Sequence, residues 1–171
     1  MILMLLSCGA LRPPAPSPTP WASHATDLAA LLLAVMILPD GYTTAPLSTT
    51  APMSLPQYDQ VIGYARLAAR NRLQQSSVEA ELSHYQNDQL ARQALAAMIN
   101  PTSMPIDHLG TRAYLHRQRS GNQFSQTIWY VRCGVVARLS SSARTEADLL
   151  SLDELSRYAQ ELDIAFERRI C

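Results

Sequence analysis

The sequence lacks the features that mark two common classes of binding protein. It contains no lysine, and its 14 basic residues, all arginine, are balanced by 14 acidic ones, so the formal net charge is zero. Proteins that bind nucleic acid or anionic lipid through a basic patch carry an excess of positive charge. No apolar run approaches the roughly 20 residues that span a bilayer. We therefore expect neither a nucleic-acid partner nor a membrane-spanning helix.

Residue patterns that support catalysis or hold a cofactor are also scarce. The sequence has no HExxH or CxxC spacing for a metal, no GxSxG elbow, and only six glycines from which to build a phosphate-binding loop. Glu79 and Glu81 lie on one side of a predicted strand, which suits acid–base chemistry, but solvated sheet faces carry such pairs routinely. We expect no cofactor, no metal and a non-catalytic protein. None of the four histidines, His24, His84, His108 and His116, belongs to such a metal-binding spacing.

The chain begins with a short apolar run that ends at Ser7 and Cys8. No basic residue precedes this run, whereas an ordinary secretory signal has a basic first region. The quartet Leu5-Leu6-Ser7-Cys8 resembles the signal of bacterial lipoproteins, in which a leucine lies three residues before the cysteine. That resemblance implies that Cys8 becomes the mature N-terminus and carries a lipid. The alternative is an ordinary buried or chance cysteine.

A proline-rich stretch follows, with five prolines within eight residues. Such a composition excludes helix and sheet and favours an extended spacer. We therefore divide the chain into a lipoprotein-like signal at 1–8, a tether at 9–25 and one domain at 26–171. With the lipid, this division implies an extracytoplasmic protein anchored to the outer face of a bacterial cell membrane.

The apolar run from Leu28 to Leu38 predicts the first helix of the domain. Thr26 or Asp27 can cap its start, and Pro39 with Gly41 can end it. Because the run is apolar on every side, we expect this helix to be buried. The stretch LLLAVMILPDGYTT resembles a segment near the start of actinobacterial-type secreted lipoproteins.

The remaining sequence alternates strand-like and helix-like periodicities, after a Thr/Pro-rich loop predicted at 43–57. Strands are expected at 61–68, 77–85, 110–118, 127–131 and 135–139, and helices at 87–100 and 151–170. Short connections between the strands predict an α+β domain with a mainly antiparallel sheet of about five strands packed by helices, in the order α-ββ-α-βββ-α. This order resembles the PsbP-like α/β/α sandwich, and a resemblance of fold implies no activity.

Two cysteines remain if Cys8 carries a lipid. In an oxidising compartment Cys133 and Cys171 are expected to form a disulfide that ties the last helix to a hairpin turn. The alternatives are two unpaired thiols, or a reactive Cys133 thiol beside the cationic Arg132.

Aromatic side chains on the predicted strands provide the best candidates for a binding site. With arginines nearby they would line a pocket or a partner surface, since tyrosine, tryptophan and arginine are enriched at such sites. The alternative is ordinary core and cross-strand packing. The candidates for ligand binding are Tyr85, Tyr114, Arg112, Trp129 and Tyr130.

Two functional hypotheses follow from these observations. The first is a membrane-anchored, non-catalytic lipoprotein that serves as a binding or sensory module for a lipid, a small apolar ligand or an envelope protein. The second is a secreted, hydrolase-like enzyme with an unrecognised site. A purely structural envelope protein is a third possibility.

Overall fold

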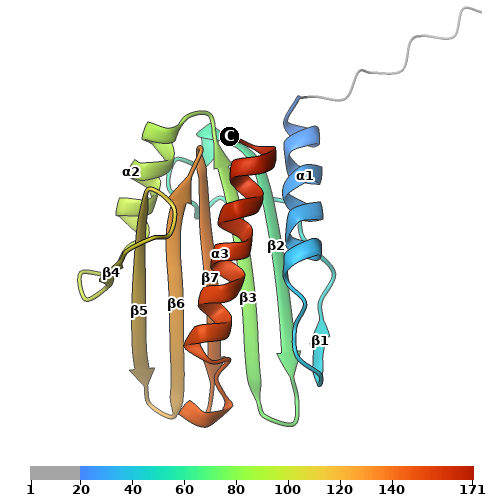
Figure 1. Cartoon of the computed structure of the whole chain (residues 1–171), viewed down its shortest axis with the longest axis vertical. Helices are drawn as coiled ribbons and strands as arrows, with labels where there is room; N and C mark the ends of the chain where they lie inside the picture. Colours follow the sequence, from blue (N-terminus) through green and yellow to red (C-terminus); the bar gives the residue numbers. More distant parts are fainter. Residues whose placement is uncertain (1–19) are drawn as a thin grey trace, which may run out of the picture.

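The computed structural model describes residues 20–171, with side chains from His24 onward (Figure 1). The predicted signal at 1–8, the lipid-bearing Cys8 and the first part of the predicted tether lie outside the described residues.

One antiparallel sheet of seven strands forms the centre of the described chain, in the order β1-β2-β3-β7-β6-β5-β4. Three helices pack on this sheet: α1 (Pro20–Val35), α2 (Asp88–Met98) and α3 (Leu152–Arg169). Two short 3-10 turns, η1 (Tyr58–Gln60) and η2 (Glu146–Asp148), lie in the connections. The strands are β1 (Tyr42–Thr44), β2 (Val61–Asn71), β3 (Ser76–Tyr85), β4 (Met104–Ile106), β5 (Arg112–Ser120), β6 (Gln123–Arg132) and β7 (Val135–Ala143).

The α+β class and the five longer strands are confirmed, but the predicted strand count is too low. The two edge strands, β1 and β4, were not expected from the sequence. Each has only three residues and pairs on one side, so neither shows the alternation that reveals a half-buried strand. Four of the longer strands extend further than predicted and β5 is shifted by two residues, because hairpin pairing continues into polar residues that periodicity does not detect.

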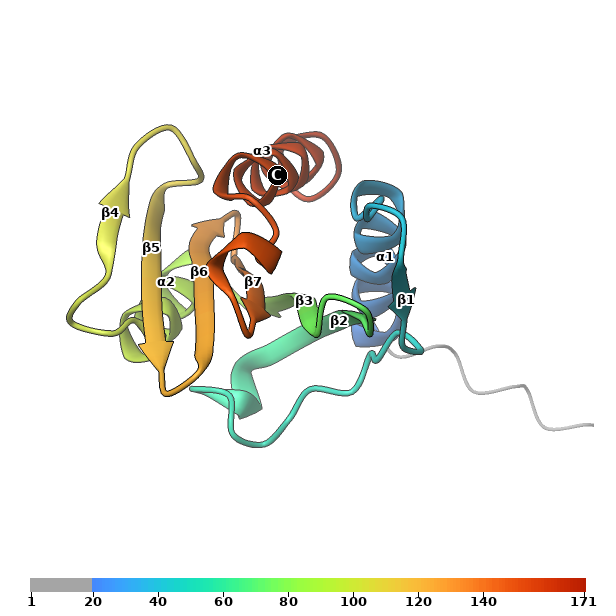
Figure 2. The ribbon, with the colours of Figure 1, turned by 90° about the horizontal axis from the view of Figure 1, so that it is seen from below.

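The helices cover the two faces of the sheet unequally. Figure 2 shows α1 and α3 above one face and α2 on the other side. The main core lies beneath α1 and α3 and includes Leu82, Leu139 and Phe166. A smaller cluster beneath α2 includes Tyr85, Leu95 and Val136. We call the side of the sheet that carries α2 the α2 face. Helix α2 covers one end of this face (Figure 1, Figure 2).

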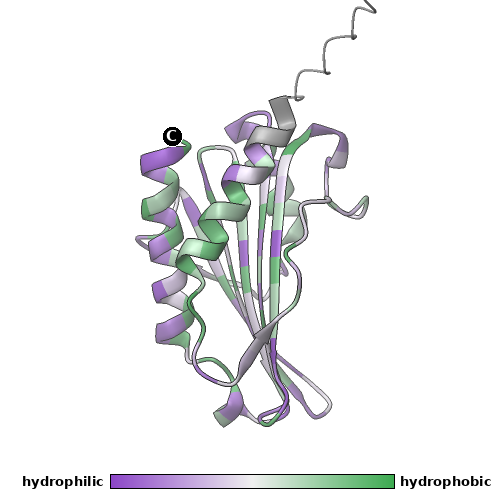
Figure 3. Cartoon of the chain, turned by 90° about the vertical axis from the view of Figure 1, so that its right-hand side faces the viewer, coloured by the Kyte–Doolittle hydropathy of each residue, from purple (hydrophilic) through white to green (hydrophobic). Residues whose placement is uncertain are grey.

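Helix α1 differs from its prediction in its bounds and in its burial. It begins at Pro20, within the predicted tether, because proline fits the first turn of a helix, where its missing N–H is not needed. Leu28 and Leu32 are buried, but Leu33 is 62% exposed, so the helix is not buried all round. Figure 3 shows green, hydrophobic residues on the outward side of α1. No helix within residues 20–171 has both the length and the apolar character to cross a membrane.

The predicted starts of the other two helices are confirmed. The Asn87 side chain accepts a hydrogen bond from the Leu90 amide at 3.0 Å and caps α2. Ser151 and Glu154 form the predicted capping box at the start of α3. Each cap satisfies helix amides that would otherwise lack a partner.

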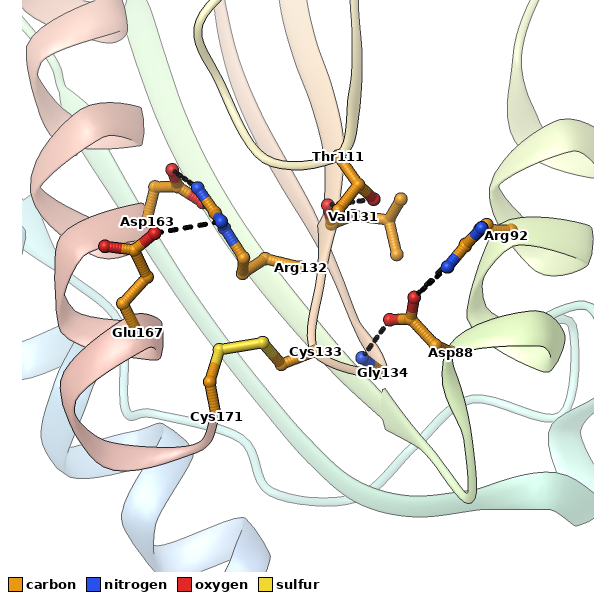
Figure 4. Close-up of a disulfide and its surroundings, with 10 residues drawn as sticks. All are labelled: Asp88, Arg92, Thr111, Val131, Arg132, Cys133, Gly134, Asp163, Glu167 and Cys171. Carbon is orange, nitrogen blue, oxygen red and sulfur yellow. Dashed lines mark hydrogen bonds and ion pairs between the residues drawn. A yellow bond between two sulfur atoms is a disulfide. The ribbon is translucent and has the colours of Figure 1, made fainter.

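The turn between β6 and β7 contains the predicted disulfide. Cys133 and Gly134 have φ values of 48° and 77°, the left-handed pair that a two-residue hairpin turn requires. Cys133 is bonded to Cys171, with their Cα atoms 5.4 Å apart (Figure 4). The alternatives of free thiols and of a reactive Cys133 are therefore wrong for this structure.

Polar contacts on both sides of this turn connect it to two helices. Arg132 donates to the two carboxylate oxygens of Asp163 on α3 at 2.8 and 2.6 Å, and its Nη1 lies 2.9 Å from Glu167 (Figure 4). On the other side, the Gly134 amide donates to Asp88 on α2 at 2.8 Å. Both layers of helices are thus joined to one turn of the sheet.

Replacing Arg132 by glutamine would leave the buried Asp163 carboxylate without its cation. We expect the Arg132→Gln variant to lose about 3 kcal/mol of unfolding free energy in a denaturant titration, as for other partly buried pairs that lose one partner. Arg157→Gln is the matched control, because Arg157 makes an exposed pair with Glu161 within the same helix and should contribute less than about 0.5 kcal/mol. Equal losses in the two variants would contradict this assignment.

Candidate functional site

The structure does not place the five predicted binding residues on one face. Tyr130 faces α3, is fully buried, and has its ring centroid 6.0 Å from that of Phe166. Burial raises the pKa of its hydroxyl well above the ordinary value. Tyr130 is therefore part of the main core, and its assignment to a surface site is corrected.

The other four residues lie on or beside the α2 face, in different surroundings. Tyr85 is fully buried beneath α2, where its hydroxyl donates to the Pro56 carbonyl at 3.1 Å and burial raises its pKa to about 12. Tyr114 is half-buried and pairs across the strands with Trp129. Arg112 is exposed and lines a separate open hollow of about 710 Å³ beside α2. Of the predicted residues, Trp129 is the one that lines the hollow described next.

Trp129 borders a hollow of about 320 Å³ on the part of the α2 face that the helix leaves uncovered. We call it the sheet-face hollow. Its floor is formed by side chains of β2, β3, β6 and β7, and its walls by the loop before β2 and by the end of α2. The lining residues are Pro52, Ser54, Leu55, Pro56, Tyr64, Arg66, Glu79, Glu81, Met98, Trp129 and Arg138.

The floor of the sheet-face hollow holds a network of opposite charges. Nη1 of Arg138 lies 2.8 Å from a carboxylate oxygen of Glu79 and 3.1 Å from one of Glu81. Arg66 lies 2.6 Å from the second oxygen of Glu79. Both carboxylates suggested by the sequence as an acid–base pair are thus bound to arginine. Because their oxygens already accept hydrogen bonds from arginine, this arrangement favours binding over acid–base chemistry.

Arg138 also contacts the aromatic part of the site. Trp129 and Arg138 are directly opposite each other on β6 and β7, and the guanidinium carbon lies 5.2 Å from the Trp129 ring centroid. This geometry is a cation–π contact. The Nε of Arg138 is buried and has no hydrogen-bond partner among the described residues. The indole and the charge network therefore form one connected surface.

The Thr/Pro-rich segment predicted at 43–57 as an extended loop forms the far wall. It first follows the edge of β2, where the Ala45 amide donates to Ala68 at 2.8 Å and Ser48 bridges to Arg66. It then crosses to α2, where Gln57 donates to Gln93 at 3.1 Å. Long loops of this kind in compact domains are often binding elements.

Tyr64 separates the sheet-face hollow from a second hollow of about 450 Å³. Tyr64 is only 3% exposed, and burial together with the Glu81 carboxylate raises the pKa of its hydroxyl well above the ordinary value. The second hollow lies under the same loop and is bordered by Ala25 of α1 and by Tyr58 and Asp59 of η1. The loop and Tyr64 thus link α1 to the binding face.

The described residues include no group of three or more histidine, cysteine, aspartate or glutamate side chains that could hold a metal ion. The site offers instead an apolar wall of Leu55, Pro56 and Met98 facing arginine and glutamate side chains. Such a surface can bind a small molecule that has an apolar body and a polar head.

Sequence reasoning missed Arg66, Arg138 and the loop wall. The sequence held only a weak signal, because Arg66 and Arg138 lie within predicted strands and could face the glutamates across a sheet. Their pairing with the glutamates could be identified only from the strand order, which places β3 between β2 and β7.

Comparisons with known proteins give one informative result. No model of a protein family matches the sequence, and no curated protein matches it as a relative. Among solved structures, the extracellular domain of PknH from Mycobacterium tuberculosis is similar, with a TM-score of 0.53 and 9% sequence identity over 82% of this chain and 92% of that one. The chain shares the fold of this extracellular domain. The comparisons contain no support for a PsbP-like relationship or for the lipoprotein signal, which stay predictions.

Proposed function

We propose that the chain is an extracytoplasmic, non-catalytic binding module that holds a small amphipathic ligand in the sheet-face hollow. The extracytoplasmic setting is supported by the fold shared with an extracellular domain and by the disulfide, since disulfides persist in oxidising compartments.

The observation that carries the proposal is the composition of the hollow. One wall is apolar and comes from the loop and α2, while the floor carries two arginines, two glutamates and a half-buried tryptophan. Arg66 has 46% of its side chain exposed, so its guanidinium can receive a polar head while the apolar body contacts Leu55 and Met98. A lipid or another small apolar ligand with a polar group has this chemistry.

The predicted membrane anchor completes this proposal. A lipid on Cys8, followed by a proline-rich spacer, would hold the module near the outer face of the cell membrane. The alternative of a secreted, hydrolase-like enzyme is untested. The ion-paired state of Glu79 and Glu81 favours binding over that alternative.

The sheet-face hollow can be tested with 1-anilinonaphthalene-8-sulfonate, a probe with an apolar ring system and one anionic head. The chain has two tryptophans, so a Trp21→Phe background leaves Trp129 as the single donor for energy transfer. We expect saturable quenching of Trp129 at neutral pH, and an affinity about tenfold or more weaker in Leu55→Asp, because the new charge removes the apolar wall.

Leu73→Asp is the matched control, because Leu73 is 94% exposed at the tip of the β2–β3 hairpin, outside the hollow. Its affinity for the probe should equal that of the background. Unsaturable quenching, or equal weakening by both substitutions, would overturn the assignment of the hollow as a binding site.

The anchor is tested separately by the intact mass of the natural product extracted from bacterial membranes. Processing at Cys8 predicts a chain that begins at this residue and carries added acyl mass. An unprocessed chain without acyl groups would remove the anchor from the proposal and would leave the binding hollow to be judged by the probe.

A further inference from the structure

Two histidines that the proposed binding site does not use meet where the first turns of α1 contact the sheet. The ring of His24 on α1 meets the ring of His84 on β3 edge to face, with centroids 5.1 Å apart and planes at 89°. Neither ring has a hydrogen bond or ion pair to another residue of the described part of the chain.

The backbone of β2 brings α1 unusually close at this point. A Cβ atom added to Gly63 would lie 3.1 Å from the Cβ of His24, a tight contact, so glycine permits this approach without a shift of its neighbours. The pairing of β2 with β3 is irregular between Val61 and Gly63, next to His84. His24 therefore rests directly on the sheet beside Gly63.

The charged side chains near the two rings either form ion pairs with other residues or are exposed to solvent. Asp88 and Arg132 border a hollow that His84 also lines, but Asp88 is bound to Arg92 and to the Gly134 amide, while Arg132 is bound to α3. On the sheet, Tyr64 of β2 turns to the opposite face. The exposed charges on the neighbouring elements are Asp27 on α1, Asp59 on η1, and Glu167, Arg168 and Arg169 on α3.

Among the described residues, no carboxylate forms an ion pair with either ring. Burial, and then the charge of His24, lower the pKa of His84 from its ordinary 6.5 to about 4. A histidine whose pKa is lower in the folded state stabilises that state above the unfolded pKa. Its contribution is lost as the pH falls from about 6.5 towards 4.

We propose that the contact between His24 and His84 is an acid-sensitive clasp that holds the first two turns of α1, residues 20–27, on the sheet. In acid, a proton on the half-buried His84 ring places a charge in a contact that offers it no ion-pair partner among the described residues, and release of these turns returns the ring to water. Leu28, Leu31 and Leu32 are buried in the main core and keep the rest of α1 docked. Because Ala25 borders the second hollow, release would open that hollow beside Tyr64. The clasp goes beyond the proposed binding function and does not depend on it.

Hydrogen exchange of the full, disulfide-bonded chain tests the clasp. Exchange would be followed at about pH 7.5 and at about pH 4.5, after correction for the intrinsic effect of pH. We expect the amides of residues 24–27, the first in α1 with intrahelical acceptors, to lose protection by about tenfold or more in acid, while those of residues 28–35 change much less. Equal changes in both regions, or no change, would overturn the proposal.

Variants assign the effect to the two rings. In His84→Gln, residues 24–27 should show the same protection at both pH values, whereas His116→Gln, which changes a histidine on the opposite face, should behave as the unmodified chain. Persistent acid release in His84→Gln would overturn the proposal.

The His84→Gln substitution could itself release residues 20–27 at every pH. An NMR titration of the His84 ring in the unmodified chain avoids this problem. Its midpoint should lie well below 6.5 and coincide with the loss of protection. A midpoint at or above the ordinary value would overturn the clasp.

Discussion

The turn between β6 and β7 is the constraint on which the three layers of this molecule depend. Its disulfide fixes the end of α3, the Arg132–Asp163 pair orients the same helix over the main core, and the Gly134 amide donates to the Asp88 carboxylate of α2. The Gly134 carbonyl also accepts the amide of Tyr85 from β3 at 2.8 Å. Cys133 has a left-handed backbone conformation, which costs conformational energy for any residue other than glycine. In this conformation its sulfur is bonded to Cys171, which follows α3.

The candidate binding site follows from the same hairpin. Trp129 lies three residues before Arg132 on β6, and Arg138 faces it from β7, so the turn sets their register. The pairing of β7 with β3 then places Glu81 directly opposite Arg138. Glutamate, arginine and tryptophan thus form one row across three strands, which come from distant parts of the sequence. The loop before β2 adds the apolar wall and converts this row into a hollow.

Local signals predicted much of this structure correctly. The caps at Asn87 and Ser151 marked two helix starts, and the alternation of Val78, Ala80 and Leu82 marked β3. The two residues Trp129 and Tyr130 were grouped in one site although neighbours on a strand must face opposite ways, so the period of two already separated them. Non-local features could not be predicted in this way. The short edge strands have too few residues for a pattern, and the strand order that brings Arg138 to Glu79 arises only from tertiary packing.

The disulfide at the β6–β7 turn holds α3 on the sheet, and this role can be tested by equilibrium unfolding of the chain with the bond intact and with it reduced. The bond joins residues separated by 38 positions, and the chain-entropy model assigns about 4 kcal/mol to a loop of this size. We expect the free energy of unfolding to fall by roughly this amount on reduction, and hydrogen exchange in the last turns of α3 to become faster. An unchanged free energy of unfolding, with α3 equally protected in both forms, would contradict it.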